Sequence, residues 1–236
     1  MRIQNITALF QKQLKDVFKN LPILVLFFVY PIIATVMTNA MRDQADVGTV
    51  FVSIFATMHC VFTPIVATTS IIAEEKEKNT LRVLIMSNVT LREYLTSIGG
   101  FILLATLLTG SSFLFINGST ADFSQPLLPL LARGALIVFG CLVSIALGIC
   151  IGLLSKNAAA ANGLAVPIGM IFAFTPMLAN FNKGIETISR FTYGQQISYL
   201  FAGKPITVMG IVILCINFVA LIVIATALFK KSLSTE

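Results

Sequence analysis

The residue types of this chain that could do chemistry are not arranged in a catalytic motif. Its single histidine, His59, stands beside Cys60 in an apolar run, with Thr57 and Thr63 as polar neighbours. The 236 residues contain no His-Glu-x-x-His zinc motif, no Gly-x-Ser-x-Gly turn and no Walker phosphate loop. We therefore predict that the chain is not an enzyme, binds no metal, and carries no cofactor of its own.

His59 leaves two interpretations open. An ionisable group inside a membrane often marks a proton or substrate path, but a neutral imidazole with a threonine or backbone partner can also simply pack. The four cysteines (Cys60, Cys141, Cys150 and Cys215) all lie in apolar runs, whereas a disulfide framework would place them in polar loops. We expect them to be small buried hydrophobic residues.

The densest group of charges lies between Glu74 and Glu93 and begins Glu-Glu-Lys-Glu-Lys-Asn-Thr-Leu. An ordinary solvated loop with charge pairs four residues apart would explain the charges. It would not explain the apolar residues that follow, such as Val83 and Leu84. A helix that combines charge with an apolar stripe is suited to a groove on a membrane surface or a protein partner.

The elements that must position these residues are membrane spans. Hydrophobic residues make up 57% of the chain, charged residues only 11%, and the mean hydropathy is +0.93. Soluble domains carry about 25% charged residues, so this composition excludes a soluble enzyme and a disordered chain. A span needs about 20 apolar residues. We predict an all-α polytopic membrane protein with six spans, at about 21–40, 48–73, 94–116, 132–154, 159–178 and 206–229.

Residues 1–20 predict an amphipathic helix that lies in the membrane interface. At helical spacing, one apolar face collects Ile3, Ile6, Phe10, Leu14, Val17 and Leu21, and the opposite face collects Lys12, Lys15 and Lys19. The run that follows is too long for the apolar region of a signal peptide, so we expect an uncleaved first span. The spans and their loops then fill 21–231.

The distribution of cations predicts the orientation. Of the 16 Lys and Arg, 11 flank the N-terminus, the 74–93 segment, the fourth loop and the C-terminus. By the positive-inside rule, both termini are therefore cytoplasmic. The five cations on the outer side are Arg42, Arg133, Lys183, Arg190 and Lys204. The net charge of +6 thus reports topology and does not indicate a nucleic-acid binder.

The Glu-Glu-Lys-Glu-x-x-Thr-Leu motif directly after the second span resembles the type-2 ABC exporter permease family. The interfacial N-terminal helix, the six spans and the semi-polar segment before the last span agree with this resemblance. It implies a coupling helix at 74–91 that docks on an ATP-binding subunit. The motif is matched by Glu74, Glu75, Lys76, Glu77, Thr80 and Leu81.

The same resemblance implies the other parts of a transporter. Residues 1–20 correspond to the connecting helix, and 181–205 to short external re-entrant helices that cap the exit. It implies two copies of this permease, expected to be identical, working with two ATP-binding subunits or one tandem subunit. ATP and Mg²⁺ would be bound by that partner chain, and the complex would lie in the plasma membrane of a bacterium.

Two further patterns concern the spans. The fourth span carries Gly140, Ser144, Gly148 and Gly152 at i+4 spacing, which predicts a close packing ridge, either within the chain or at a moving or subunit surface. In the family the second and fifth spans of two subunits line the path. The candidate lining residues here are Phe55, Met58, His59, Phe62, Met170, Phe172, Phe174 and Met177, although each could equally fill the core.

These candidates make the path largely apolar, and Arg133, at the outer end of the fourth span, is the only carboxylate or arginine that falls within the predicted spans. An amphipathic substrate, such as a drug, a lipid-like molecule or an antimicrobial peptide, suits such a path better than an inorganic ion. The competing hypotheses are an ATP-independent secondary transporter and a structural membrane anchor. The two halves show no convincing internal repeat of the kind that many secondary transporters have.

Overall fold

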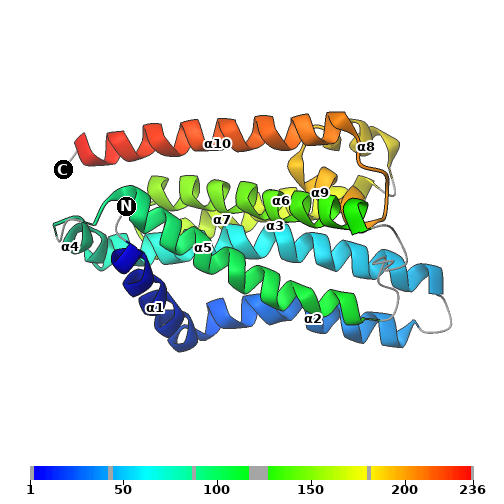
Figure 1. Cartoon of the computed structure of the whole chain (residues 1–236), viewed down its shortest axis with the longest axis horizontal. Helices are drawn as coiled ribbons and strands as arrows, with labels where there is room; N and C mark the ends of the chain where they lie inside the picture. Colours follow the sequence, from blue (N-terminus) through cyan, green and yellow to red (C-terminus); the bar gives the residue numbers. More distant parts are fainter. Residues whose placement is uncertain (1–2, 42–44, 87–88, 117–126, 180–181, 235–236) are drawn as a thin grey trace.

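The computed structural model describes residues 3–41, 45–86, 89–116, 127–179 and 182–234, and within these ranges all regular structure is helical (Figure 1). This confirms the predicted all-α class. The helices are α1 (Ile3–Lys19), α2 (Leu21–Ala40), α3 (Ala45–Glu77), α4 (Thr80–Met86), α5 (Leu91–Gly110), the 3-10 turn η1 (Ser111–Phe115), α6 (Leu127–Leu154), α7 (Ala158–Ala179), α8 (Lys183–Ser189), α9 (Tyr193–Phe201) and α10 (Val208–Ser234).

Six of these helices are long and apolar enough to cross a membrane: α2, α3, α5 with η1, α6, α7 and α10. They run roughly alongside one another, with α4 and both chain termini at one end of the bundle and α8 and α9 at the other (Figure 1). We call these the α4 end and the α8 end. The predicted number of spans is confirmed, and their order along the chain is as expected.

The boundaries of the second span differ from the expectation. The predicted span ends at residue 73, but α3 continues as an unbroken helix to Glu77 and so includes the start of the charged cluster. Glu74–Glu77 are good helix formers with tertiary partners, so nothing in the local sequence stops the helix there. The helix α5 begins with a capping box, in which Thr90 Oγ1 accepts from Glu93 N and the Glu93 carboxylate accepts from Thr90 N.

The centre of the bundle is α3, which packs against α2, α5, α6, α7 and α9. Most of α3 and α6 is buried inside the chain, whereas α7 and α10 bury only small parts of their surfaces. The buried face of α7 consists of small residues (Ala161, Ala165, Gly169, Ala173, Pro176 and Ala179). The small face lets α7 approach α3 closely and leaves its large apolar residues on the outside.

The predicted ridge of the fourth span lies on α6 and packs within the chain. Gly140 faces α9 and Gly152 faces α3. At Gly148 an added Cβ would lie only 2.7 Å from the carbonyl oxygen of Ile65, and Ser144 Oγ donates to the carbonyl oxygen of Cys60 at 3.2 Å. The ridge therefore brings the backbones of α3 and α6 together at a distance that a larger side chain would prevent.

The inward face of α1 differs from the predicted apolar face. The structure buries Leu9, Gln13 and Val17, while Leu14 and Phe18 are exposed. The prediction holds in part, since Val17 of the predicted face is buried and Phe10 packs against the core. Gln13 was not on that face, and its burial is compensated by the hydrogen bond from its amide to the Glu75 carboxylate. The expectation of four buried cysteines was also wrong at one position, since Cys215 on α10 is exposed.

Candidate functional site

The helix expected over 74–91 is two separate elements. α3 ends at Glu77, the backbone turns at Lys78 and Asn79, and the short α4 follows. Asn79 has φ of 54°, in the left-handed region that asparagine tolerates better than most residues. The turn separates the charged run Glu74–Glu77, at the end of α3, from the mostly apolar α4.

Glu74 and Glu75 bind the first helix of the chain. Asn20 Nδ2, between α1 and α2, donates to Glu74 Oε1 at 2.7 Å. Glu75 Oε1 accepts from Gln13 Nε2 at 2.9 Å and forms an ion pair with Lys12. Glu75 and Gln13 are 7% and 1% exposed, so this contact is shielded from water. Such charge-assisted hydrogen bonds are among the stronger ones in proteins.

Lys76 and Glu77 bind the turn between α6 and α7. Lys76 Nζ donates to the carbonyl oxygens of Leu153 and Ser155, at 2.8 and 2.7 Å, where α6 ends. Glu77 Oε2 accepts from the backbone N of Ala158 at 2.8 Å, where α7 begins. A cation at a helix C-terminus and an anion at a helix N-terminus are both favourable to the helix dipoles.

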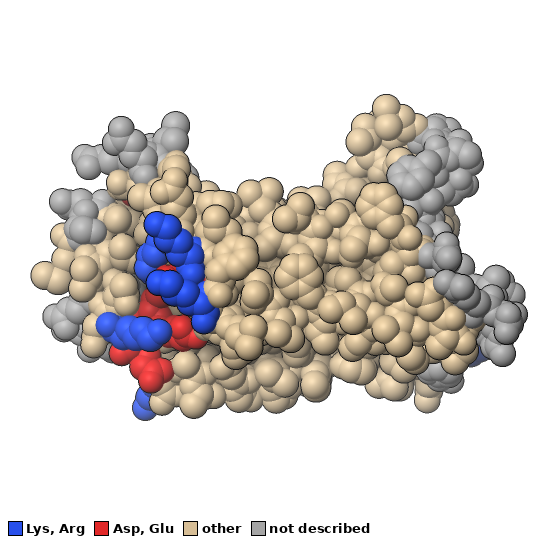
Figure 2. Space-filling view, turned by 90° about the horizontal axis from the view of Figure 1, so that it is seen from below, with Lys and Arg blue, Asp and Glu red and all other residues tan. Residues whose placement is uncertain are grey.

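The four consecutive residues Glu74–Glu77 therefore join the end of α3 to three other parts of the chain, and we call them the hub. Lys12 and Lys78 lie beside it, and together with the three glutamates of the hub they line a groove of about 810 Å³ between α1 and the last turn of α3. Figure 2 shows the Lys, Arg, Asp and Glu side chains of this face gathered at one end. Any displacement of the end of α3 must move α1 and the α6–α7 turn with it, or break these bonds.

The helix α4 projects from the hub at the end of the bundle (Figure 1). Its Leu84 packs against the core, whereas Val83 and Met86 are 62% and 77% exposed. Thr80 is partly buried at the edge of the groove, and the side chain of Leu81 lies outside the described residues. The structure thus offers an apolar surface on α4, whereas the charged residues of the predicted motif bind other parts of the same chain.

The candidate path residues on α3 lie inside the chain. Met58, His59 and Phe62 are buried, and Phe55 is half-buried. His59 is 0% exposed, with Nε2 lying 3.0 Å from the carbonyl oxygen of Thr106 and 3.1 Å from Thr109 Oγ1 on α5. Of the two interpretations of His59, these contacts favour packing.

The candidate path residues on α7 are divided between its two sides. Met170 and Phe174 are 45% and 37% exposed, and Met177 and Phe172 are partly buried. Phe172 contacts the ring of Tyr193 on α9 at a centroid distance of 5.2 Å. The structure therefore does not bring the eight candidates to one surface of a single chain.

Several residues of the hub network could not be found from the motif. Lys12, Gln13 and Asn20 lie more than fifty residues away from their hub partners in the sequence. Outside the hub, the motif also gave no indication of the contact between α3 and α7 in which Ser70 Oγ donates to Asn162 Oδ1 at 2.7 Å. One signal was present: Gln13 interrupts an otherwise apolar face of α1. A polar residue on such a face requires a buried partner.

The α8 end carries a second group of charges, around α8 and α9. Arg190 donates to Glu186 at 3.2 Å, and Tyr199 Oη donates to the same carboxylate at 3.3 Å. The bond from Arg190 lowers the pKa of Glu186 below its ordinary value, and the same pair raises the pKa of Arg190. Partial burial raises the pKa of Tyr199. Glu186 is therefore ionised at neutral pH.

Comparison with known protein families places nearly the whole chain in one family. The model of the family described as ABC-2 family transporter protein matches residues 3–230. The matched region includes α1, the hub, α4, the short helices α8 and α9, and all six spans. No curated protein matches the sequence significantly. Because the family model covers nearly the whole chain, the protein belongs to the ABC-2 family of transporter proteins and is a type-2 ABC transporter permease.

Proposed function

We propose that this permease is the membrane-spanning part of an ATP-driven exporter that moves an amphipathic substrate out of the cell. The substrate class is a drug, a lipid-like molecule or an antimicrobial peptide, because the candidate path residues are mostly apolar and aromatic. A separate ATP-binding subunit, in two copies or as one tandem chain, supplies ATP and Mg²⁺ and hydrolyses the nucleotide. The complex lies in the plasma membrane of a bacterium, with both permease termini in the cytoplasm.

The observation that carries this proposal is the pairing of the hub with α4. The exposed Val83 and Met86 give the partner an apolar surface to bind. The hub then connects the base of α4 to α1, α6 and α7 through bonds of 2.7 to 2.9 Å from Glu74, Glu75, Lys76 and Glu77. When the partner closes on ATP and pushes on α4, these bonds transmit the push to the spans. Such a bundle then shifts between two packings.

In this proposal a second, identical copy of the chain covers the exposed face of α7. Met170 and Phe174 lie on that face and would line the path between the two copies. The buried residues Met58, His59 and Phe62 would reach the path only if the helices separate during transport. The exposed face of α7 is large and apolar, which suits either a second copy or lipid.

The test is co-purification of an ABC ATP-binding chain from the same cell with this permease. In the variant Val83→Asp/Met86→Asp, we expect the partner to be lost, because two carboxylates would have to be desolvated at the docking surface. Both side chains are exposed, so the permease itself should still fold. The matched control is Ile188→Asp, which changes a side chain of equal exposure (76% against 77% for Met86) at the α8 end.

If the double variant retained the partner and its ATP-driven transport, α4 would not be the coupling helix. If the wild-type chain bound no ATP-binding subunit and transported substrate along an ion gradient, a secondary transporter would be the better conclusion. A chain that bound a partner but moved nothing would be a membrane anchor. Two measurements, partner binding and transport, therefore distinguish these three possibilities.

A further inference from the structure

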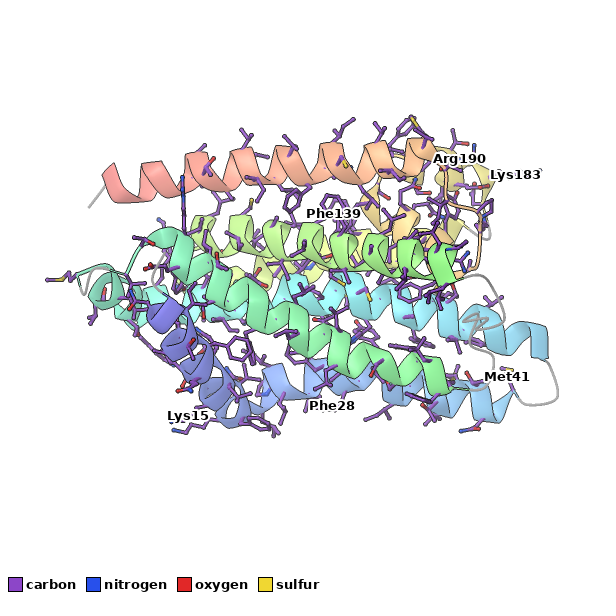
Figure 3. All side chains as sticks on the ribbon, in the orientation of Figure 1. Lys15, Phe28, Met41, Phe139, Lys183 and Arg190 are labelled. Carbon is purple, nitrogen blue, oxygen red and sulfur yellow. The ribbon has the colours of Figure 1, made fainter. Side chains whose placement is uncertain are left out.

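A pocket of about 450 Å³ lies at the α8 end, between α8, α9 and the first turns of α10. We call it the α8–α10 pocket. It is at the opposite end of the bundle from α4 and the hub, so it lies outside the surface proposed to bind the ATP-binding subunit (Figure 1). Figure 3 shows Arg190, directly after α8, beside the start of α10, and Lys183 at the first residue of α8.

The polar side of the pocket has an excess of positive charge. Its described lining contains two cations, Arg190 and Lys204, and one carboxylate, Glu186. Arg190 is held by Glu186 at 3.2 Å, and its side chain remains 58% exposed. Lys204 Nζ lies 4.2 Å from the centroid of the Tyr199 ring and is exposed as well. Both cations therefore line the pocket, and each has more N–H donors than these contacts use, so that a ligand can accept hydrogen bonds from them.

These cations are unusual for their position. The positive-inside rule predicts few Lys and Arg at the end of the bundle opposite the main clusters. Of the five that the sequence places there, Lys183 begins α8, Arg190 follows it and Lys204 lies just before α10. A fourth, Arg133, donates to the carbonyl oxygen of Gly203 at 3.3 Å. Topology does not explain why two of these cations, Arg190 and Lys204, line the same pocket, whereas an anionic ligand does.

The other side of the pocket is apolar. It is formed by Leu136 of α6 and by Met209 and Ile213 of α10. Both helices are candidate membrane spans, so this wall continues into the region where acyl chains lie. Met209 is 57% exposed, which leaves the wall accessible from the side. A small soluble anion would use only the cations, and a purely apolar molecule would use only this wall.

We propose that the α8–α10 pocket binds a phospholipid, with its phosphate between Arg190 and Lys204 and its acyl chains along Leu136, Met209 and Ile213. A phosphate has the oxygen acceptors that a guanidinium and an ammonium group recognise. Tyr199 and Glu186 hold the two cations in place on one side. The bound lipid fixes the cap helices α8 and α9 to α10 at the membrane surface.

Native mass spectrometry of the delipidated chain in detergent tests this directly. The probes are dioleoyl phosphatidylglycerol, dioleoylglycerol with the same chains but no phosphate, and glycerol 3-phosphate with no chains. We expect the wild-type chain to retain the phospholipid and neither of the other two probes. In Arg190→Gln/Lys204→Gln, retention should fall about ten- to thirtyfold, since a cation near a lipid surface contributes about 1 kcal/mol.

Two matched variants separate the pocket from general attraction. Lys183→Gln removes an exposed cation of α8 that does not line the pocket, so phospholipid retention should be unchanged. Met209→Trp narrows the pocket and keeps both cations, so retention should fall. Met209 is exposed, which keeps the fold intact.

The proposal is overturned if Lys183→Gln weakens binding as much as the double variant, because the attraction would then be non-specific. It is also overturned if glycerol 3-phosphate or dioleoylglycerol binds as tightly as the phospholipid. Unchanged retention in both the double variant and Met209→Trp would place the lipid elsewhere. None of these results depends on the ATP-binding subunit, so the proposed transport function would stand or fall separately.

Discussion

Replacement of Glu75 by alanine should destabilise the permease much more than removal of the other carboxylate near Lys12. Glu75 is buried and binds two side chains of α1, Lys12 and Gln13. Asp16 also approaches Lys12, but at 3.8 Å and with a side chain that is 54% exposed. The two carboxylates therefore share a partner and differ in burial, which makes Asp16→Ala the matched control.

The magnitude follows from what each substitution leaves behind. In Glu75→Ala the amide of Gln13, which is 1% exposed, loses its acceptor, and an orphaned buried donor costs about 1–3 kcal/mol. The ion pair with Lys12, whose side chain is 31% exposed and so partly screened, adds about 0.5–1 kcal/mol. We expect a total loss of about 2–4 kcal/mol. Asp16→Ala should cost less than about 0.5 kcal/mol.

Thermal unfolding of the purified permease in detergent is the assay. For a chain of this size, each kcal/mol shifts Tm by about 2–4 °C, so Glu75→Ala should lower Tm by roughly 5–15 °C and Asp16→Ala by at most about 2 °C. The double variant Gln13→Ala/Glu75→Ala should be less destabilised than the sum of its two single variants, by about 1 kcal/mol, because both disrupt one contact.

The reasoning would be refuted by equal shifts for Glu75→Ala and Asp16→Ala. It would also fail if Gln13→Ala and Glu75→Ala were strictly additive. Either result would mean that the contact between α1 and α3 does not contribute to stability. The hub would then be unable to transmit movement from α4 to α1, and the proposed coupling would lose its support on that side.

Three further predictions concern other parts of the chain. Gly148→Ala should lower the stability of the folded chain by about 1–3 kcal/mol, because the added Cβ would meet the backbone of α3. Gly163→Ala, where the added Cβ has open space, should be neutral or slightly stabilising, and measuring Tm for both variants tests the contrast. His59→Leu should lower Tm and leave substrate selectivity unchanged, and altered selectivity at an unchanged Tm would contradict the packing interpretation. Because Arg190 lowers the pKa of Glu186 in the folded chain, their pair stabilises α8 above the ordinary glutamate pKa and is lost as the pH falls through the lowered value. Hydrogen exchange of the α8 amides, corrected for its intrinsic pH dependence, should therefore accelerate at acidic pH in the wild type and not in Glu186→Gln.

Much of the architecture could be predicted from local sequence. The six spans follow from apolar runs of about 20 residues, because the length and composition of such a run are sufficient to specify a membrane helix. The start of α5 follows from Thr90 and Glu93, which form a capping box three residues apart. The i+4 spacing of the ridge on α6 predicted close packing, although not its neighbours, α3 and α9.

The sequence therefore determined the fold class, the number and order of the spans, the family, and the presence of a charged motif beside an apolar helix. Only the tertiary structure decided that Glu74–Glu77 bind Gln13, Asn20 and the α6–α7 turn, and that the exposed apolar surface belongs to α4. The physical reason is the range of the interactions. The length of an apolar run and the cap of a helix are both set within one continuous segment of the chain, of about 20 residues or fewer. The partner of a buried charge is instead chosen by packing among segments more than fifty residues apart.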